Sequence, residues 1–333
     1  MGGSPTAGPK VWALGDLEDT HVSLGLLGAT VVLVGLLRVV TLWGLPDGDP
    51  RRRPGPRLRP FLMELLATFQ LCACTHELTV QADLNPSPHF GLTLTYFFTV
   101  IHGLTLTGSF CNPCAVLQKM AMERLAVETG ILRILAQMAG ALLARAYMVA
   151  VWSLGLIEQH RADRHRACRN PMRTDVPEAC LVEAICSFIF HSAVIQLKYI
   201  RPKLRIHLQA ALITFLVFAG GSITGAVFNP ALALSLHMKC FQGEFHNFAI
   251  VYWVGPTAGK RGRLPSAGKG GSRRRPPGSV SGEASEQGHA TSFPGWLPQG
   301  GDVGEAAWLS GKSPGLGVRD HGFECRLCPL SAG

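Results

Sequence analysis

The sequence predicts an all-α membrane protein of two inverted halves, each with a re-entrant half-helix, in which the last spanning helix is truncated. Charged residues are only 16% of the 333-residue chain, against about 25% in soluble domains. Apolar runs near spanning length recur along it. The box Thr-Gly-x-x-x-Asn-Pro occurs twice, at residues 107–113 and 224–230, with its asparagines 117 residues apart. A repeated box in repeated apolar surroundings indicates a duplicated half.

The first apolar run covers residues 22–43 and is long enough to span, with Arg38 expected to reach the membrane surface near one end. Two placements stay open for this run, an additional span or a helix lying along the membrane. Spanning would put the N-terminus on the side of the membrane opposite the Arg-rich loop that follows, the lumenal side of an intracellular membrane. Residues 51–59 follow with five Arg in nine positions, and such a loop is expected on the cytoplasmic side.

The central part of the chain contains further apolar segments at residues 60–80, 90–108, 129–156, 177–197 and 204–220. The loop 51–59 and the basic loop 198–205 flank four of them, so an even number of crossings puts both loops in the cytoplasm. Residues 161–173 fall on the opposite side despite five Arg, and they are an exception to this rule.

The last apolar segment is short. Residues 248–259 supply 12 positions, whereas a spanning helix needs about 20. The following residues are rich in Gly, Pro, Ser and Arg, and we expect a disordered tail that replaces half of the last helix. The chain thus divides into an N-terminal region, a helical membrane domain and a tail, at residues 1–59, 60–259 and 260–333.

Each box predicts a helix start, because Asn is a good N-cap and Pro is favoured at the first helical position. The residues concerned are Asn112, Pro113 and Cys114 in the first box and Asn229, Pro230 and Ala231 in the second. The apolar stretch after each start is about two or three turns long, too short to span. Gly108 and Gly225 permit the tight approach of a re-entrant loop.

If the two half-helices enter from opposite faces, their N-termini meet at mid-membrane. Each would bring roughly half a positive charge and an Asn amide that donates hydrogen bonds. Such a centre orients a water molecule through its oxygen and opposes cations and protons, which suits a pore for small neutral solutes. The alternative, two unrelated helix caps, is disfavoured because Thr-Gly precedes both.

Glu64 and Glu183 form a second repeated pair, 119 residues apart, near the starts of two apolar segments. They precede the box asparagines by 48 and 46 residues. A carboxylate in a membrane segment is costly and serves function or a polar network. We expect both to accept hydrogen bonds from the re-entrant loops. Proton relay is the weaker alternative, since spacing places no second titratable group beside them.

Together these motifs resemble the aquaporin (major intrinsic protein) family over residues 60–259. The likeness is carried by both boxes, Glu64, Ala136-Gln137, Gly140-Ala141, Glu183, Gly255-Pro256 and Gly259. The first box, with Cys114 after Asn-Pro, resembles that of the divergent intracellular subgroup of the family. The resemblance implies six tilted helices plus two half-helices, and a homotetramer in membrane lipid with one pore per protomer. It also implies an endoplasmic-reticulum or other intracellular membrane, passage of water, glycerol and hydrogen peroxide, and no enzymatic activity.

The resemblance further assigns a selectivity filter that departs from the family pattern. Where most members carry Arg three residues after the second Asn, this chain has Leu232. The usual His position is Val217 and the adjacent loop position is Ala226. The aromatic position is assigned to Phe90, although its spacing leaves this open. Such an apolar, wider constriction is expected to slow water and to admit larger neutral solutes.

No cofactor or metal site is expected. Cys111-x-x-Cys114 and Cys325-x-x-Cys328 match C-x-x-C, but neither has the βαβ context of a redox motif. By resemblance, Cys240 is an oligomer or redox contact, with a plain thiol as the alternative. The net charge of +9 resides in loops between apolar runs, so nucleic acid is not an expected partner.

Three classes of function follow. The first is a passive channel for water and small neutral solutes. The second is a non-conducting protein of the same lineage, in which the truncated last helix prevents pore assembly and leaves a structural or dominant-negative role. The third, a coupled transporter, is disfavoured because no paired ion-binding carboxylates adjoin the boxes.

Overall fold

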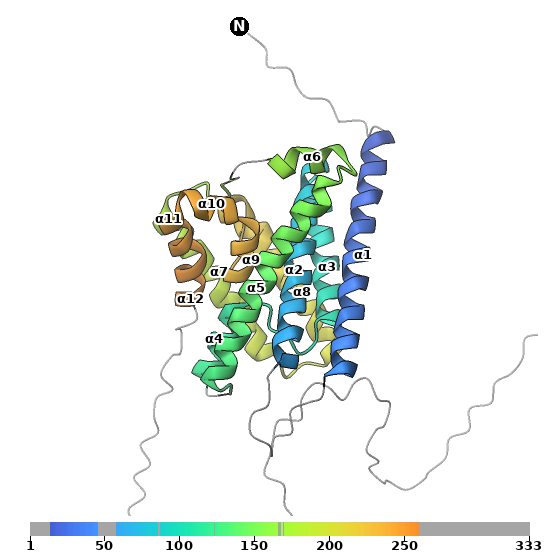
Figure 1. Cartoon of the computed structure of the whole chain (residues 1–333). Helices are drawn as coiled ribbons and strands as arrows, with labels where there is room; N and C mark the ends of the chain where they lie inside the picture. Colours follow the sequence, from blue (N-terminus) through green and yellow to red (C-terminus); the bar gives the residue numbers. More distant parts are fainter. Residues whose placement is uncertain are drawn as a thin grey trace, which may run out of the picture. The chain divides into compact units, whose positions relative to one another are not determined.

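The structure is a computed structural model that describes residues 14–45, 58–85, 87–122, 124–165, 168 and 170–259. Regular secondary structure within these ranges is entirely helical (Figure 1). The chain has two compact units, residues 1–275 and 276–333, and the described residues belong to the first. The tail expected at 260–333 lies outside the described residues, as does the loop at 46–57.

The first half contains the helices α2 to α5, preceded by the additional helix α1. Helix α1 (Leu14–Gly44) packs along α2 (Leu58–Leu84). Next come α3 (Pro88–Thr105), a re-entrant loop, the short α4 (Pro113–Ala121) and α5 (Val127–Ser153). The predicted apolar segments of this half are confirmed as helices, with their ends shifted.

The second half has the same order of elements, two long helices, a half-helix and a last helical run, but with inverted orientation. The short α6 (Glu158–His165) is followed by the long helices α7 (Val176–Leu197) and α8 (Pro202–Thr224), and then by the half-helix α9 (Pro230–Leu236). Four short pieces complete it: α10 (Met238–Gly243), α11 (Phe245–Ala249), the π-helix η1 (Ile250–Val254) and α12 (Gly255–Ala258). In Figure 1, α4 lies toward one end of the bundle and α10 and α11 toward the other. The half-helices therefore enter from opposite ends, as an inverted repeat requires.

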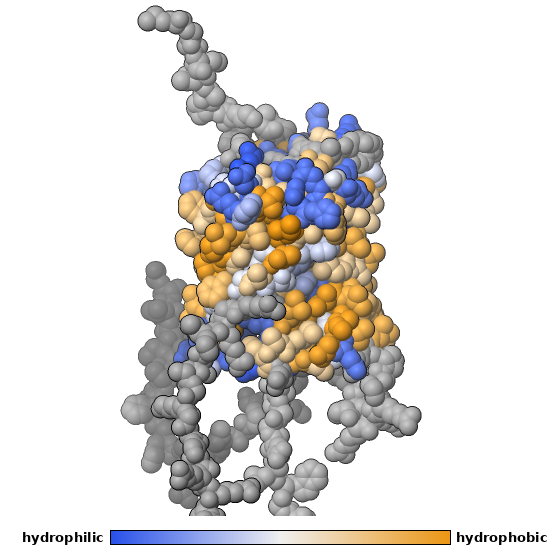
Figure 2. Space-filling model, turned by 90° about the vertical axis from the view of Figure 1, so that its left-hand side faces the viewer, coloured by the Kyte–Doolittle hydropathy of each residue, from blue (hydrophilic) through white to orange (hydrophobic). Residues whose placement is uncertain are grey.

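Four helices, α1, α5, α7 and α8, are long and apolar enough to cross a membrane by length and composition. Apolar side chains are exposed on their outer faces, for example Val40 on α1 and Phe218 on α8. On the face shown in Figure 2, hydrophobic residues cover much of the middle while hydrophilic residues gather at one end. Helix α2 differs in composition because it carries buried polar residues, among them Glu64 and Glu77.

Glycines let helices approach closely in both halves. A Cβ at Gly140 of α5 would lie 2.5 Å from the Leu65 carbonyl oxygen of α2. In the second half, a Cβ at Gly255 of α12 would lie 2.8 Å from the Cys180 carbonyl oxygen of α7. These contacts leave no room for a side chain. The pairs α2–α5 and α7–α12 are thus the matching close seams of the two halves.

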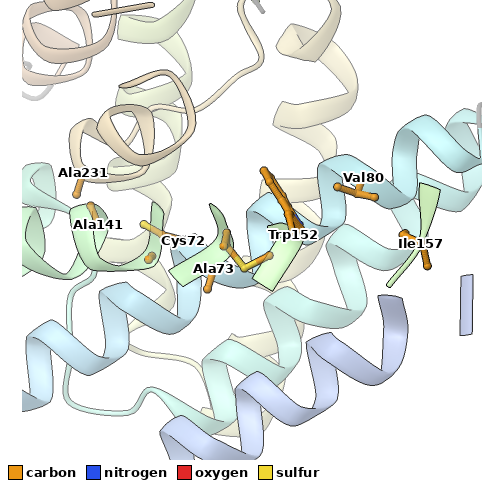
Figure 3. Close-up of a cluster of buried hydrophobic side chains, with 9 residues drawn as sticks. Cys72, Ala73, Val80, Ala141, Trp152, Ile157 and Ala231 are labelled. Atoms are coloured by element: carbon orange, nitrogen blue, oxygen red, sulfur yellow. The ribbon is translucent and has the colours of Figure 1, made fainter. Parts of the chain in front are cut away.

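One buried apolar cluster joins α2, α5 and α9 (Figure 3). Its members are Cys72, Ala73, Val80, Ala141, Ala144, Met148, Trp152, Ile157 and Ala231. Several of these side chains are small, which brings the helices close together. Ala231 belongs to the first turn of α9, so this cluster fixes the half-helix of the second box against the first half.

One expectation about an individual side chain is wrong. Arg38 does not reach the surface: its side chain is 4% exposed and donates hydrogen bonds inside the bundle. The start of the basic segment 161–173 belongs to α6. Acceptors in a distant part of the chain, such as the Thr107 carbonyl oxygen, decide where the Arg38 side chain lies.

Candidate functional site

The first re-entrant loop connects α3 to α4 and ends at Asn112. The Asn112 side chain caps α4, its Oδ1 accepting from the Cys114 backbone N–H at 2.8 Å. Gly108 has φ +81° and Cys111 has φ +53°. The glycine adopts this left-handed region freely, whereas a non-glycine residue there costs about 1–3 kcal/mol. The loop therefore needs support from its surroundings.

The second re-entrant loop connects α8 to α9 and ends at Asn229. The Asn229 Oδ1 accepts from the backbone N–H groups of Ala231 at 3.1 Å and Leu232 at 3.4 Å. Gly225 has φ +86°, and Ala226 and Phe228 have φ +46° and +34°. Among the described residues, all non-glycine residues with positive φ lie in these two loops. Helix starts at Pro113 and Pro230, predicted from the sequence, are confirmed.

The two loops bind each other through crossed hydrogen bonds. Asn112 Nδ2 donates to the Phe228 carbonyl oxygen at 3.1 Å, and Asn229 Nδ2 donates to the Cys111 carbonyl oxygen at 2.8 Å. Each amide nitrogen carries two hydrogens, so each keeps one for a further acceptor. The N-termini of α4 and α9 therefore meet, and their dipoles place partial positive charge at this junction.

Glu64 supports the first loop from α2. Its Oε1 accepts from the backbone N–H groups of Phe110 at 2.8 Å and Cys111 at 2.7 Å, and from Gln137 Nε2 at 2.8 Å. Its Oε2 forms an ion pair with an Arg133 guanidinium nitrogen at 3.0 Å. The carboxylate is 1% exposed, so these donors replace the water it would otherwise bind.

Glu183 supports the second loop from α7 with neutral donors. Its Oε1 accepts from Thr224 Oγ1 at 2.7 Å and from the Val227 N–H at 3.1 Å. Its Oε2 accepts from the Phe228 N–H at 2.6 Å. The Tyr252 hydroxyl of η1 donates to the Thr224 carbonyl oxygen at 2.6 Å. The two carboxylates thus accept from corresponding backbone N–H groups of the two loops, but their side-chain partners differ.

The four residues assigned to the filter lie on separate elements. Leu232 is half-buried on α9 and Val217 half-buried on α8. Ala226 is 3% exposed and packs in a cluster with Cys186 and Phe228, and Phe90 lies at the start of α3. Within the described part of the chain, these four share no hydrogen bond or ring contact. The filter therefore stays a prediction.

Cys240, for which an oligomer or redox contact was expected with a plain thiol as the alternative, is bonded within the chain. Its sulfur forms a disulfide with Cys168, and the two Cα atoms are 4.7 Å apart. The Cys240 side chain is also 3% exposed, so no thiol is offered to a neighbouring protomer. The sequence alone did not predict this pairing, because no local pattern connects two cysteines that are 72 residues apart.

A second buried carboxylate was missed by sequence reasoning. Glu77 of α2 accepts from Trp152 Nε1 at 3.0 Å, bonds His160 Nε2 at 2.9 Å, and accepts from the Ser23 hydroxyl. These contacts join α1, α2, α5 and α6. No three His, Cys, Asp or Glu side chains among the described residues gather as metal ligands.

Two half-helices capped by asparagine, entering from opposite ends and joined by crossed amide bonds, define the class: a channel-type membrane protein with inverted repeats. The sequence profile described as "Major intrinsic protein" matches residues 87–261. The chain belongs to this family, the aquaporins, and is a multi-pass membrane channel protein.

Individual relatives agree with this family. "Aquaporin-11" of Equus caballus is 51% identical over 255 residues, covering 76% of this chain and 90% of the relative. "Aquaporin-11" of Homo sapiens is 50% identical over 252 residues, covering 75% and 90%. "Aquaporin-12" of Mus musculus is more distant, at 32% over 250 residues, covering 73% and 83%. Among solved structures, the aquaglyceroporin from Plasmodium falciparum aligns with a TM-score of 0.48 and 18% identity, over 61% of this chain and 92% of that one.

Proposed function

We propose that this chain forms a passive path for water and small neutral solutes, with glycerol and hydrogen peroxide among them. The observation that carries the proposal is the crossed pair of Asn112 and Asn229, each with one amide hydrogen left to donate. Solutes that present an oxygen acceptor bind such donors. Cations and protons meet the positive ends of two helix dipoles instead.

We further propose that the constriction near Leu232 is apolar. An arginine at this position would narrow the path and add a positive charge, whereas a leucine does neither. We therefore assign the filter to Leu232, Val217, Ala226 and, on α3, Phe90. An apolar filter favours neutral solutes larger than water and slows water itself, since it offers few hydrogen bonds to replace those lost.

The proposed setting is an intracellular membrane, specifically the endoplasmic reticulum, with the protein as a homotetramer surrounded by lipid. The disulfide Cys168–Cys240 supports one part of this assignment. Disulfides form in oxidising compartments such as the lumen of the endoplasmic reticulum. The end of the bundle that carries α6 and α10 would then be lumenal, and the Arg-rich loop 51–59 cytoplasmic.

The proposed channel domain is residues 60–259, between an N-terminal region at 1–59 and a tail at 260–333. One observation favours a second candidate, a non-conducting protein with a structural or dominant-negative role. The last apolar run, residues 248–259, has 12 positions before Lys260 and Arg261, whereas its neighbour α7 has 22 residues. If the path needs a full-length last helix, this chain would not conduct.

Reconstitution of the full chain in proteoliposomes tests the channel. We expect swelling in water and glycerol gradients, and peroxide entry into dye-loaded vesicles, above empty vesicles and without dependence on ion gradients. Asn229→Ala removes a cap and a donor and should bring flux toward background. Asn247→Ala is the matched control, since Asn247 lies on α11, away from the boxes, and its side chain donates to Glu244 at 3.2 Å. Inserted protein with the flux of empty vesicles would favour the non-conducting candidate.

A further inference from the structure

The helix α1 is additional to the two halves and lies beside α2 on the outside of the bundle (Figure 1). Its outward face is apolar and exposed, as in Val32 and Trp43. Its central run, residues 22–43, holds a single charged residue, Arg38. That side chain is 4% exposed, so it points into the protein rather than to lipid or water.

Arg38 reaches the first re-entrant loop with both terminal nitrogens. One guanidinium nitrogen donates to the Met63 carbonyl oxygen at 2.8 Å and to Ser109 Oγ at 3.1 Å. The other donates to the Thr107 carbonyl oxygen at 2.8 Å. Ser109 Oγ in turn donates to the Met63 carbonyl oxygen at 3.2 Å. The guanidinium therefore ties the loop to the residue that directly precedes Glu64.

An arginine is costly at this depth unless its donors are paired and serve a purpose. A lipid-facing helix needs no such residue to remain in the membrane. The planar fork of arginine also matches two acceptors in different directions, which the single ammonium of lysine does not. The contacts of Arg38 therefore indicate a role for its geometry and not only for its charge.

We propose that Arg38 is a positioning residue of the pore, and that α1 serves as a strut that holds the first box in place. The loop it binds, residues 107–109, is followed within three positions by Asn112. Holding this loop fixes the Cys111 carbonyl oxygen that accepts from Asn229 Nδ2 at 2.8 Å. The inference deepens the proposed function and rests on it, since the loop is the proposed pore wall.

The corresponding position of the second loop has a different hydrogen-bond donor. The carbonyl oxygen of Thr224, which corresponds to Thr107 in the repeat, accepts from the neutral Tyr252 hydroxyl at 2.6 Å. Tyr252 belongs to η1, inside the second half. The same repeat position is thus bound by a cation from an additional helix in one half and by a phenol in the other. Loss of Arg38 should therefore disturb the first loop more than the second, which Arg38 does not contact.

Cysteine reactivity tests the inference without depending on conduction. Cys111 and Cys114 flank Asn112 and are 7% and 0% exposed, while Cys186 is 6% exposed and packs against the second loop through Phe228. The full-length protein in proteoliposomes is treated with iodoacetamide, and alkylation at each cysteine is followed by peptide mass spectrometry. We expect Arg38→Met to raise the rates at Cys111 and Cys114 by about tenfold, equivalent to about 1.4 kcal/mol. The Cys186 rate should stay within about twofold, about 0.4 kcal/mol.

Two milder variants complete the test. Arg38→Lys keeps the charge but not the fork, and Ser109→Ala removes one acceptor, so both should give smaller increases at the same two cysteines. They carry the test if Arg38→Met fails to insert. Unchanged rates at Cys111 and Cys114 in these variants would overturn the proposal. An equal rise at Cys186 would also overturn it, because Arg38 would then only stabilise the bundle as a whole. Reactivity changes without any flux in the unmodified protein would support the strut while refuting the channel.

Discussion

At the residue scale, each box asparagine uses its two side-chain atoms for different tasks. The oxygen caps its own half-helix, and the nitrogen donates to the opposite loop. A cap contributes about 1 kcal/mol. The crossed bonds additionally make each loop depend on the other. The geometry of the junction is therefore set jointly by both halves, although each half was recognised from its own box.

The first residue-scale prediction concerns Leu232. We expect Leu232→Arg to lower glycerol and peroxide flux in proteoliposomes by about tenfold or more, since an added barrier of about 1.4 kcal/mol has this effect. The larger arginine side chain would narrow the path and place a positive charge in it. Water flux should fall less. Leu232→Met, which changes neither charge nor much volume, is the control and should behave as the unmodified protein. Unchanged selectivity in Leu232→Arg would remove Leu232 from the filter.

The second residue-scale prediction concerns the ion pair of Glu64 and Arg133. Glu64→Gln should lower the thermal unfolding temperature in detergent, because it leaves Arg133 without its carboxylate and costs about 1–3 kcal/mol. In an Arg133→Gln background the same change should cost less, since the cation that forms the ion pair with Glu64 is already gone. Coupling between contacting residues is typically about 0.5–3 kcal/mol.

The control for this cycle uses the second carboxylate. Glu183 accepts hydrogen bonds from neutral groups of the second loop, so Glu183→Gln and Arg133→Gln should act independently. If Glu64→Gln and Arg133→Gln were simply additive, the ion pair would contribute nothing measurable to the first loop.

At the element scale, the half-helices could be predicted because their signal is local. Asn before Pro supplies the cap and the first helical residue, and a short apolar stretch limits the length. The structure starts α4 at Pro113 and α9 at Pro230 accordingly. The spacing of Glu64 and Glu183 also placed both carboxylates near the loops. Their partners Arg133 and Gln137 could not be identified, because a sequence does not show which face of α5 meets α2.

Other elements depend on contacts that no local pattern reveals. Helix α6 is highly polar, and His160 within it bonds Glu77 at 2.9 Å, far along the chain. Arg38 was expected at the membrane surface because it lies near one end of an apolar run. Instead, its guanidinium group lies inside the bundle, where it donates to acceptors of the first loop such as the Thr107 carbonyl oxygen. In each case a three-dimensional partner replaces the rule that applies to an isolated helix.

At the scale of the whole channel unit, the two halves share one plan but differ in what surrounds them. The first half has the additional helix α1 and two arginines, Arg38 and Arg133, at its loop. The second half has neutral donors at its loop and a last helical run of short pieces against α7. Its loop is instead connected through α9 and α10 to the disulfide partner Cys168. The disulfide thus ties α10 of the second half to the segment that precedes α7.

The last prediction concerns this disulfide. Full-length protein in intact microsomes, alkylated and then denatured, should gain two reactive thiols on reduction, mapped by mass spectrometry to Cys168 and Cys240. Cys168→Ser should leave Cys240 as a free thiol, and the reverse change should free Cys168, because each is the other's partner. Closing a loop of this size contributes about 2–4 kcal/mol, so both variants should unfold at lower temperature. Cys180→Ser is the control, since that cysteine is free in the structure. A disulfide-linked dimer that disappears in Cys240→Ser while Cys168 stays unreactive would instead restore Cys240 as a contact between protomers.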